Sequence, residues 1–263
     1  MYYYLEEKKI ISDFISKGYL VFDIINKKEL ISIKKSIISF IKKSKYFKKI
    51  NNIKNDEEIF NNIHKLVKKS DLNNFRLDIY NQINKKKDFH KNYYFIGKYY
   101  LDILCGNELA MQKLINLSIQ LPKDKSSILP IHSDVWAGDS PFELVLWLPL
   151  VDCKKTKSMF ILDPKENLKV FKNFNKINST DQLYKKVKNK LKWIDIKFGQ
   201  GLIFTQNLMH GNVSNLESTS RWSFNCRFKS ILSPYNEKSL GDFFKPITVR
   251  PATTLGISYE NPK

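Results

Sequence analysis

The second half of the chain consists of short apolar segments separated by turn-forming residues, and this pattern limits the fold more than any other feature. Pro, Gly, Asn and Asp recur between the segments, and most segments have the length of an ordinary strand. Many short strands joined by turns are typical of an antiparallel sandwich or barrel. We therefore expect a mostly β core with flanking α-helices. The expected strands cover residues 117–121, 142–150, 158–162, 193–198, 202–204 and 221–228.

The first half has the pattern of amphipathic helices. Apolar residues recur at helical spacing from Leu30 to Ile41, and Asn26 followed by Glu29 predicts a capping box where this helix begins. We expect one domain over residues 1–263. Its parts are a helical region at 1–116, a β core at 117–230 and a tail at 231–263 that packs on the core. Further expected elements are a strand at 18–22, helices near 10–15, 63–67 and 101–104, a helix stop at Gly106-Asn107, and a helix with Leu183, Tyr184, Val187 and Leu191 on one face.

Lysine dominates the net charge of +19, since only four of the 45 basic residues are arginine. Readout of bases and bidentate phosphate contacts favour arginine, so we expect no nucleic-acid partner. The lysine runs are typical of solvated helix faces and loops. A diffuse positive field of this kind attracts small anionic substrates.

We expect neither a membrane span nor a secretory signal. The longest apolar run, Leu144 to Val151, is broken by Pro149 and falls short of the roughly 20 residues that a spanning helix needs. The first residues lack the basic and apolar regions of a signal peptide. The three cysteines are far apart and form no CxxC pair, which argues against disulfides and thiolate zinc sites and favours a reducing cytoplasm.

Two of the four histidines lie at the edges of expected strands in company that suggests a metal site. His132 and Asp134 are two residues apart, so on a strand they face the same side. His210 follows the expected strand at 202–204 and supplies a third ligand. Two histidines and one carboxylate that leave positions open are the facial triad of non-haem Fe(II) oxygenases. The His-x-Asp pair alone is a weak signal.

An arginine and a serine follow this triad at the start of the next expected strand. Arg221 lies eleven residues after His210, and Ser223 shares its face of the strand. A guanidinium fork beside a hydroxyl donor suits a carboxylate. A metal site next to a carboxylate site is what a chelating 2-oxo diacid requires.

The order of these motifs resembles the Fe(II)/2-oxoglutarate-dependent oxygenases, and within them the phytanoyl-CoA dioxygenase-like branch. The resemblance spans roughly residues 10–260 and is most specific over 132–227. A narrower resemblance, to a subgroup from bacterial surface-carbohydrate clusters, rests on residues 132–143 and on the Phe-Lys-Pro-Ile-Thr segment at 244–248. The matching segments of the branch are "F…GY" at 14–22, "W.PL.D" at 147–152, and "G…F" with "HG" at 199–204 and 210–211.

This resemblance implies a double-stranded β-helix (jelly-roll, cupin-like) core. It implies Fe(II) on His132, Asp134 and His210, and 2-oxoglutarate with its far carboxylate on Arg221 and Ser223. The implied reaction hydroxylates a small anionic or carbohydrate-related substrate, such as a nucleotide sugar or glycan precursor, and forms succinate and CO2. The chain departs from the branch at 158–165, where its Gly-Ser-His loop is missing, so substrate contacts carried by that loop are in doubt.

Four other residues are candidates for the pocket. Gln120 lies just upstream of the His-x-Asp segment and could bind cofactor or substrate. Trp136 and Trp147 are candidates for a substrate wall, although aromatic residues at strand spacing are as often core. Arg227 lies on the same strand face as Arg221, and it either binds an anionic substrate group or forms a salt bridge.

Two alternatives to a 2-oxoglutarate oxygenase stay open at this point. One is a cupin-like metal-dependent isomerase or hydrolase of a sugar precursor that does not use 2-oxoglutarate. The other is a binding module with an inactive metal site. Oligomeric state cannot be read from the sequence.

Overall fold

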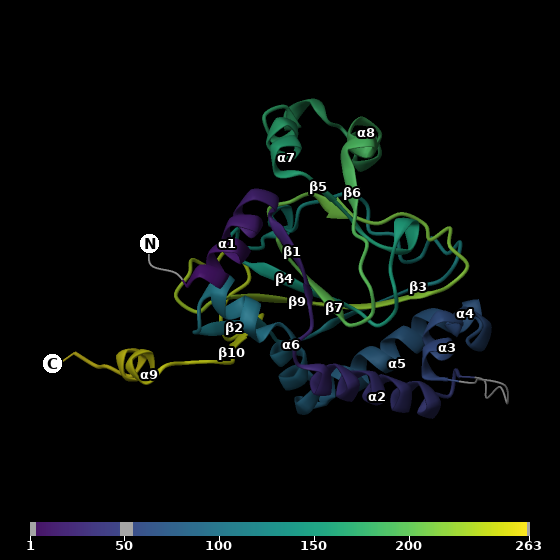
Figure 1. Cartoon of the computed structure of the whole chain (residues 1–263), viewed down its shortest axis with the longest axis horizontal. Helices are drawn as coiled ribbons and strands as arrows, with labels where there is room; N and C mark the ends of the chain where they lie inside the picture. The colour runs from purple at the N-terminus through teal and green to yellow at the C-terminus, as the bar shows by residue number, and fades with distance from the viewer. Residues whose placement is uncertain (1–3, 48–54, 262–263) are drawn as a thin grey trace.

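The computed structural model describes residues 4–47 and 55–261, and two antiparallel sheets form its centre (Figure 1). The larger sheet has the order β1-β7-β4-β9-β2-β10, and β3 also pairs with β9. The smaller sheet has the order β6-β5-β8. The larger sheet contains β1 (Tyr19–Asp23), β2 (Leu109–Gln112), β3 (Asn116–Gln120), β4 (Leu144–Pro149), β7 (Gln200–Thr205), β9 (Arg221–Ser230) and β10 (Phe244–Pro246). The smaller contains β5 (Phe160–Leu162), β6 (Leu191–Trp193) and β8 (His210–Gly211).

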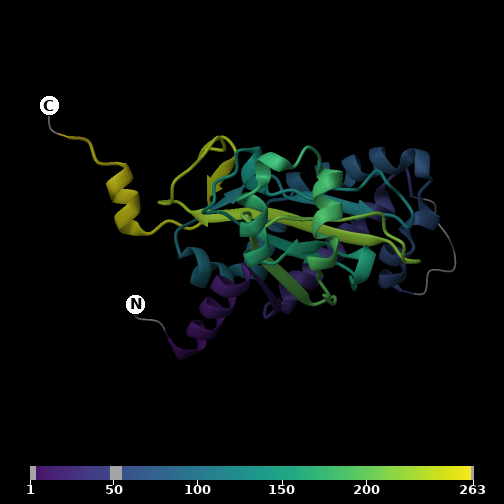
Figure 2. The ribbon, with the colours of Figure 1, turned by 90° about the horizontal axis from the view of Figure 1, so that it is seen from above.

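Helices cover the outer face of the larger sheet, and two short helices lie beyond the smaller one (Figures 1 and 2). The helices α1 and α9 lie at the same end of the molecule in both views. No helix of the described residues is long and apolar enough to cross a bilayer. The helices are α1 (Leu5–Lys17), α2 (Lys27–Lys43), α3 (Asp56–Asn61), α4 (Ile63–Leu66), α5 (Leu72–Lys85), α6 (Lys87–Cys105), α7 (Pro164–Phe171), α8 (Thr180–Val187) and α9 (Pro251–Ile257).

The strand β9 joins the helical layer to the interior because its side chains alternate between the two faces. Trp222 packs edge-on against Phe75 of α5, with ring centroids 6.0 Å apart. Phe224 packs in the same way against Phe89 of α6 at 5.5 Å. The residues of β9 that alternate with these aromatic residues, beginning with Arg221, therefore face the space between the sheets. The expected alternation along this strand is confirmed.

Several expected elements are confirmed, and others differ for local reasons. The apolar stripe of α2 is buried as expected, but its capping box is absent: the Asn26 side chain donates to the carbonyl of Phe95 instead. α6 ends at Cys105, where Gly106 was expected to stop it. A single helix was expected to carry Leu183, Tyr184, Val187 and Leu191 on one face. The structure divides this segment into two elements, since α8 ends at Val187 and Leu191 begins β6.

The larger sheet uses segments from outside the region expected to form the β core. β1, β2 and β10 come from the expected helical region and the expected tail. Residues 194–198 were expected to be strand, but of these described residues only Ile196 forms a β-bridge, to Cys153. Within the tail, Phe244 of β10 is fully buried, whereas α9 has no buried residue and projects from the body (Figure 1).

Candidate metal centre and adjacent cavity

His132, Asp134 and His210 converge, each offering a ligand atom within 4.8 Å of the others. His132 Nε2 lies 3.2 Å from Asp134 Oδ1, and His210 Nε2 lies 3.9 Å from Asp134 Oδ2. The expected strand geometry of the His-x-Asp pair is wrong, because Asp134 begins a 3-10 turn, Asp134–Ala137. Two backbone hydrogen bonds between His132 and His210, of 3.0 and 2.8 Å, bring the distant histidine into place.

Both histidines are oriented by carbonyl groups two residues earlier in the chain. His132 Nδ1 lies 2.8 Å from the Pro130 oxygen, and His210 Nδ1 lies 2.9 Å from the Leu208 oxygen. A carbonyl oxygen can only accept, so each Nδ1 carries the proton and Nε2 faces the centre. Metal-binding histidines are held by this kind of outer hydrogen bond. The geometry therefore suits a metal bound by two Nε2 atoms and a carboxylate.

The protonation states of His210 and Asp134 also suit a metal. At His132 burial lowers the pKa, but the hydrogen bond that Nε2 donates to Asp134, together with the one to the Pro130 carbonyl, outweighs it and raises that pKa, so a metal would displace the Nε2 proton. Burial lowers the pKa of His210 to about 4, so its ring is neutral near pH 7. Burial raises the pKa of Asp134, but the hydrogen bond from His132 and the positive groups around it more than offset this and hold that pKa well below its usual range. Metal ligands have to be a neutral imidazole and an ionised carboxylate.

A cavity of about 100 Å³ lies between the two sheets and reaches one of the three candidate ligands. His210 of β8 lines it from the smaller sheet, and Arg221 of β9 lines it from the larger one. Trp147, Met159 and Phe204 give it apolar walls. The other lining residues are Ser118, Ser127, Leu129, Gly211, Asn212 and Asn225.

Arg221 is buried in this cavity wall with no carboxylate beside it among the described residues. Its side chain donates to the Ser158 carbonyl at 3.2 Å and to Ser118 Oγ at 3.1 Å, and its Nε has no partner. Burial lowers its pKa to about 10, so the guanidinium stays charged near pH 7. Buried charges are ordinarily paired, so this one is open to an anion.

The other expected cofactor residues lie close to Arg221 but do not line the cavity. The Ser223 hydroxyl is buried without a hydrogen-bond partner. Gln120 pairs with Arg221 across the strands β3 and β9, and its amide donates to the Val213 carbonyl at 2.6 Å. Their proposed contacts with a cofactor remain predictions.

The structure separates the two tryptophans expected at a substrate wall. Trp147 is buried on β4 and lines the cavity. Trp136 is 40% exposed and stacks near Phe174, with ring centroids 4.8 Å apart. The turn that places Asp134 in the site carries Trp136 away from the cavity.

Arg227 forms the salt bridges that were its alternative role. Its Nε lies 3.1 Å from Asp139 Oδ1, and its Nη2 lies 3.4 Å from Asp134 Oδ2. The Gln206 side chain accepts a further hydrogen bond from Nε at 2.9 Å. Arg227 is therefore near the candidate metal ligands, as expected, but its charge is already matched by carboxylates.

Ser118 and Met159 are parts of the cavity that sequence reasoning missed. Ser118 sits on β3 directly opposite Ser223 of β9, so its hydroxyl reaches Arg221. Strand periodicity around residues 117–121 was visible in the sequence, but the pairing of β3 with β9 was not. Met159 carried no sequence signal beyond an apolar side chain.

Comparison with known proteins gives matches to solved structures alone. No protein-family model and no curated protein matches the chain. SnoK, a non-heme alpha ketoglutarate dependent carbocyclase from nogalamycin biosynthesis, matches with a TM-score of 0.56 and 13% identity, over 92% of this chain and 96% of SnoK. A nickel complex of the non-heme monooxygenase ThoJ matches with a TM-score of 0.52 and 12% identity, over 93% of this chain and 85% of ThoJ.

A third match is HygX from Streptomyces hygroscopicus, solved with nickel and 2-oxoglutarate bound. Its TM-score is 0.51 at 12% identity, over 87% of this chain and 88% of HygX. At these identities the likeness establishes a shared fold. The chain therefore has the fold of these non-heme enzymes, with an antiparallel sheet core and flanking helices.

Proposed function

We propose that this protein is an Fe(II)/2-oxoglutarate-dependent oxygenase of the phytanoyl-CoA dioxygenase-like branch, built on a double-stranded β-helix (jelly-roll). The observation that carries the proposal is the buried guanidinium of Arg221, which has no carboxylate partner among the described residues. Arg221 lines the same cavity as the candidate ligand His210. A diacid that chelates a metal at one end and reaches this arginine at the other satisfies both features.

The residues present fit an iron ion. His132, Asp134 and His210 provide two nitrogens and one carboxylate, the donor set of non-haem Fe(II) sites that leave positions open for other ligands. When bound, iron and 2-oxoglutarate supply oxidative decarboxylation to succinate and CO2 and the oxidising power for hydroxylation.

The chain itself supplies binding, orientation and exclusion of water. Arg221 and the Ser118 hydroxyl hold the far carboxylate, and we place Ser223 and Gln120 beside them in a supporting role. Trp147 and the other apolar walls keep bulk water from the cofactor. This arrangement fixes the direction of the diacid, so that its 2-oxo end faces the metal.

We propose a small anionic or carbohydrate-related substrate, such as a nucleotide sugar or glycan precursor, handled in the cytoplasm. This rests on the narrower sequence resemblance and on the net charge of +19, which favours anionic substrates. The Arg227 side chain stays a candidate for an anionic substrate group only if substrate displaces Asp139 from it.

The decisive experiment compares two acids that differ in one carboxylate. Protein loaded with Ni(II) is titrated by calorimetry with 2-oxoglutarate and with 2-oxopentanoate, which has the same chain length and no far carboxylate. We expect 2-oxoglutarate to bind at least about tenfold more tightly, since it alone pairs with Arg221. Equal affinity would favour the cupin-like isomerase or hydrolase that does not use 2-oxoglutarate. Succinate formation with Fe(II) and a panel of nucleotide sugars then tests the substrate class.

A further inference from the structure

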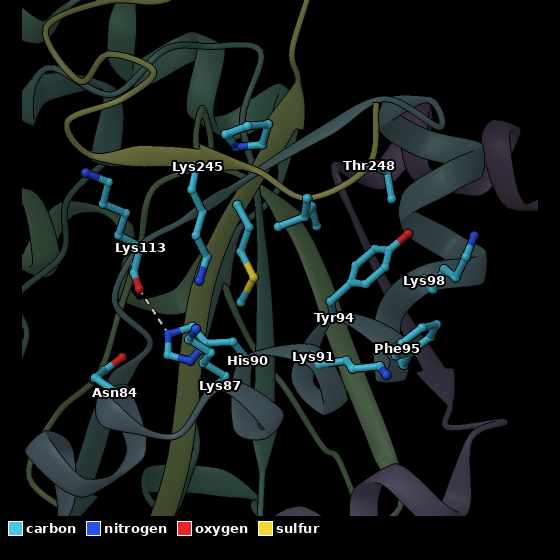
Figure 3. A pocket seen from close by; sticks show the side chains of 13 residues that line it. Asn84, Lys87, His90, Lys91, Tyr94, Phe95, Lys98, Lys113, Lys245 and Thr248 are labelled. Atoms are coloured by element: carbon cyan, nitrogen blue, oxygen red, sulfur yellow. Dashed lines mark hydrogen bonds between the residues drawn. The ribbon is translucent and has the colours of Figure 1, made fainter. Parts of the chain in front are cut away.

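A second cavity, of about 640 Å³, lies on the helix-covered side of the larger sheet (Figure 3). Residues of α6, β2, β10 and the segment after β10 line it, and we call it the α6 groove. Met111 of β2 belongs to the groove and pairs with Phe228, whereas the next residue, Gln112, faces Arg227 across the sheet. The sheet therefore separates the α6 groove from the candidate metal centre.

The α6 groove is lined by positive charge and by no acidic residue. Lysine supplies five of its 13 lining residues, whereas Lys and Arg together are 45 of the 263 residues in the chain. The charge of Lys98 is paired with Asp102, and the Lys113 ammonium donates to the Gly241 carbonyl.

Three of these lysines have neither an ion pair nor a hydrogen bond from the ammonium group among the described residues. They are Lys87 and Lys91 of α6 and Lys245 of β10. In Figure 3 the Lys245 side chain points into the groove toward His90. His90 is held by the Lys113 carbonyl, 3.0 Å from Nε2, and burial together with the charge of Lys245 lowers its pKa. The groove thus holds positive charge that nothing in the described chain neutralises.

Between the lysines the groove is apolar. Met111 and Ile247 line it together with the rings of Tyr94 and Phe95. Small-molecule sites are typically concave, about 300–1,000 Å³ in volume and mostly apolar, with a few polar groups that orient the ligand. An inorganic ion would leave these apolar walls unused, and a neutral apolar molecule would leave the lysines unpaired.

We propose that the α6 groove binds a small organic anion with an apolar or aromatic body. The ammonium groups of Lys87 and Lys245 bind the anionic group, and the apolar body lies against Met111, Tyr94 and Ile247. This inference does not depend on the proposed oxygenase activity, because the groove and the candidate metal centre lie on opposite faces of the sheet.

Methionine provides separate reporters for the two sites, since the chain has four methionines. Met111 lines the α6 groove, and Met159 lines the cavity beside the metal centre. The full chain is labelled with ¹³C in the methionine methyl groups, and Met111→Leu and Met159→Leu assign the two signals. The probe is 8-anilinonaphthalene-1-sulfonate, an aromatic anion, and its uncharged parent N-phenyl-1-naphthylamine and inorganic phosphate serve as comparisons.

We expect the sulfonate to shift the Met111 signal and to leave Met159 in place. The double variant Lys87→Gln/Lys245→Gln should weaken its binding roughly tenfold, because each exposed ion pair contributes up to about fivefold. A matched double variant, Lys28→Gln/Lys35→Gln, removes the same charge from another lysine-lined hollow, formed with the serines of α2, and should change affinity less than about twofold.

Three results would overturn the proposal. The first is a Met111 signal that the sulfonate does not move. The second is equal weakening by both double variants, which indicates unspecific attraction to a basic protein. The third is phosphate or the uncharged parent binding as tightly as the sulfonate. A Met159 shift with 2-oxoglutarate and Ni(II) tests the oxygenase proposal separately, so the two ideas can fail independently.

Discussion

Replacing Arg221 with methionine should leave the stability of the ligand-free protein nearly unchanged and remove cofactor binding. The guanidinium is 2% exposed, and burial lowers its pKa from 12.5 to about 10, which corresponds to a desolvation penalty of about 3 kcal/mol. Methionine removes this penalty and also removes the hydrogen bonds to Ser158 and Ser118, each worth about 1.5 kcal/mol because the donor is charged. We therefore expect Arg221→Met, free of ligands, to unfold with a free energy within about 1 kcal/mol of wild type.

Binding of 2-oxoglutarate should be lost in the same variant. Removing one partner of a buried charge pair costs about 3–5 kcal/mol, a factor of roughly 100 to several thousand in affinity. Urea unfolding at pH 7 measures the first effect, with and without Ni(II) and 2-oxoglutarate. A ligand that binds only the native state stabilises it by an amount that rises with the logarithm of its concentration relative to its Kd, so the cofactor should stabilise wild type and not Arg221→Met.

Arg76→Met is the matched control, because Arg76 has the counter-ion that Arg221 lacks. Its Nη2 lies 3.4 Å from Oδ2 of Asp124, which is 3% exposed. The substitution leaves that carboxylate without a cation and should destabilise the protein by about 3–5 kcal/mol. If Arg221→Met is as destabilising as Arg76→Met, or if it binds 2-oxoglutarate like wild type, then Arg221 is a structural residue and the reasoning fails.

Three further predictions concern the metal centre and its surroundings. His132→Ala should weaken Ni(II) binding more than about 100-fold in a calorimetric titration, while Arg76→Lys leaves it unchanged. Glu143 is buried and accepts hydrogen bonds from the Ser140 N–H and from the Gln206 side chain that also contacts Arg227. Burial raises its pKa from 4.5 to about 7, so its contribution to stability is present below about pH 4.5 and is lost as the pH rises through 7. Glu143→Gln should therefore stabilise the protein against urea by up to about 3 kcal/mol at pH 8 and have little effect at pH 4.5. Arg227→Gln removes one of the two cations beside the buried Asp139, where Lys238 remains, and should lower the free energy of unfolding by about 2 kcal/mol at pH 7; an unchanged value would contradict the salt bridge.

Much of the β core could be predicted because β1, β3, β4, β5, β7 and β9 each carry a local signal. The segment 221–228 alternates between polar and aromatic residues, and β9 covers all of it. β2 and β10 could not be predicted, because their short sequences have no clear alternation and exist as strands only through pairing with β9 and with each other. The absent capping box at Asn26 is also a tertiary effect, since Phe95 of another helix competes for its side chain.

The candidate ligands could be predicted from residue type and order, but not the geometry that unites them. The sequence places His132 and Asp134 two residues apart on a strand, whereas the structure has a 3-10 turn beginning at Asp134. The turn still brings the carboxylate to the centre and at the same time turns Trp136 outward, to 40% exposure. The sequence pattern alone cannot show that Asp134 faces the centre while Trp136 faces outward, because both orientations depend on how the loop leaves its strand.

The two arginines of β9 show what decides the role of a buried charge. Their spacing predicts that Arg221 and Arg227 share a face of the strand, and the structure agrees. Only the fold reveals their counter-ions, since the carboxylates at Arg227 come from the distant loop that carries Asp134 and Asp139. The fold supplies none to Arg221 among the described residues, although burial makes an unpaired charge costly. We therefore infer that an anion from outside the described residues pairs with Arg221, and its place in the cavity that His210 also lines is the reason to seek a diacid that can reach a metal.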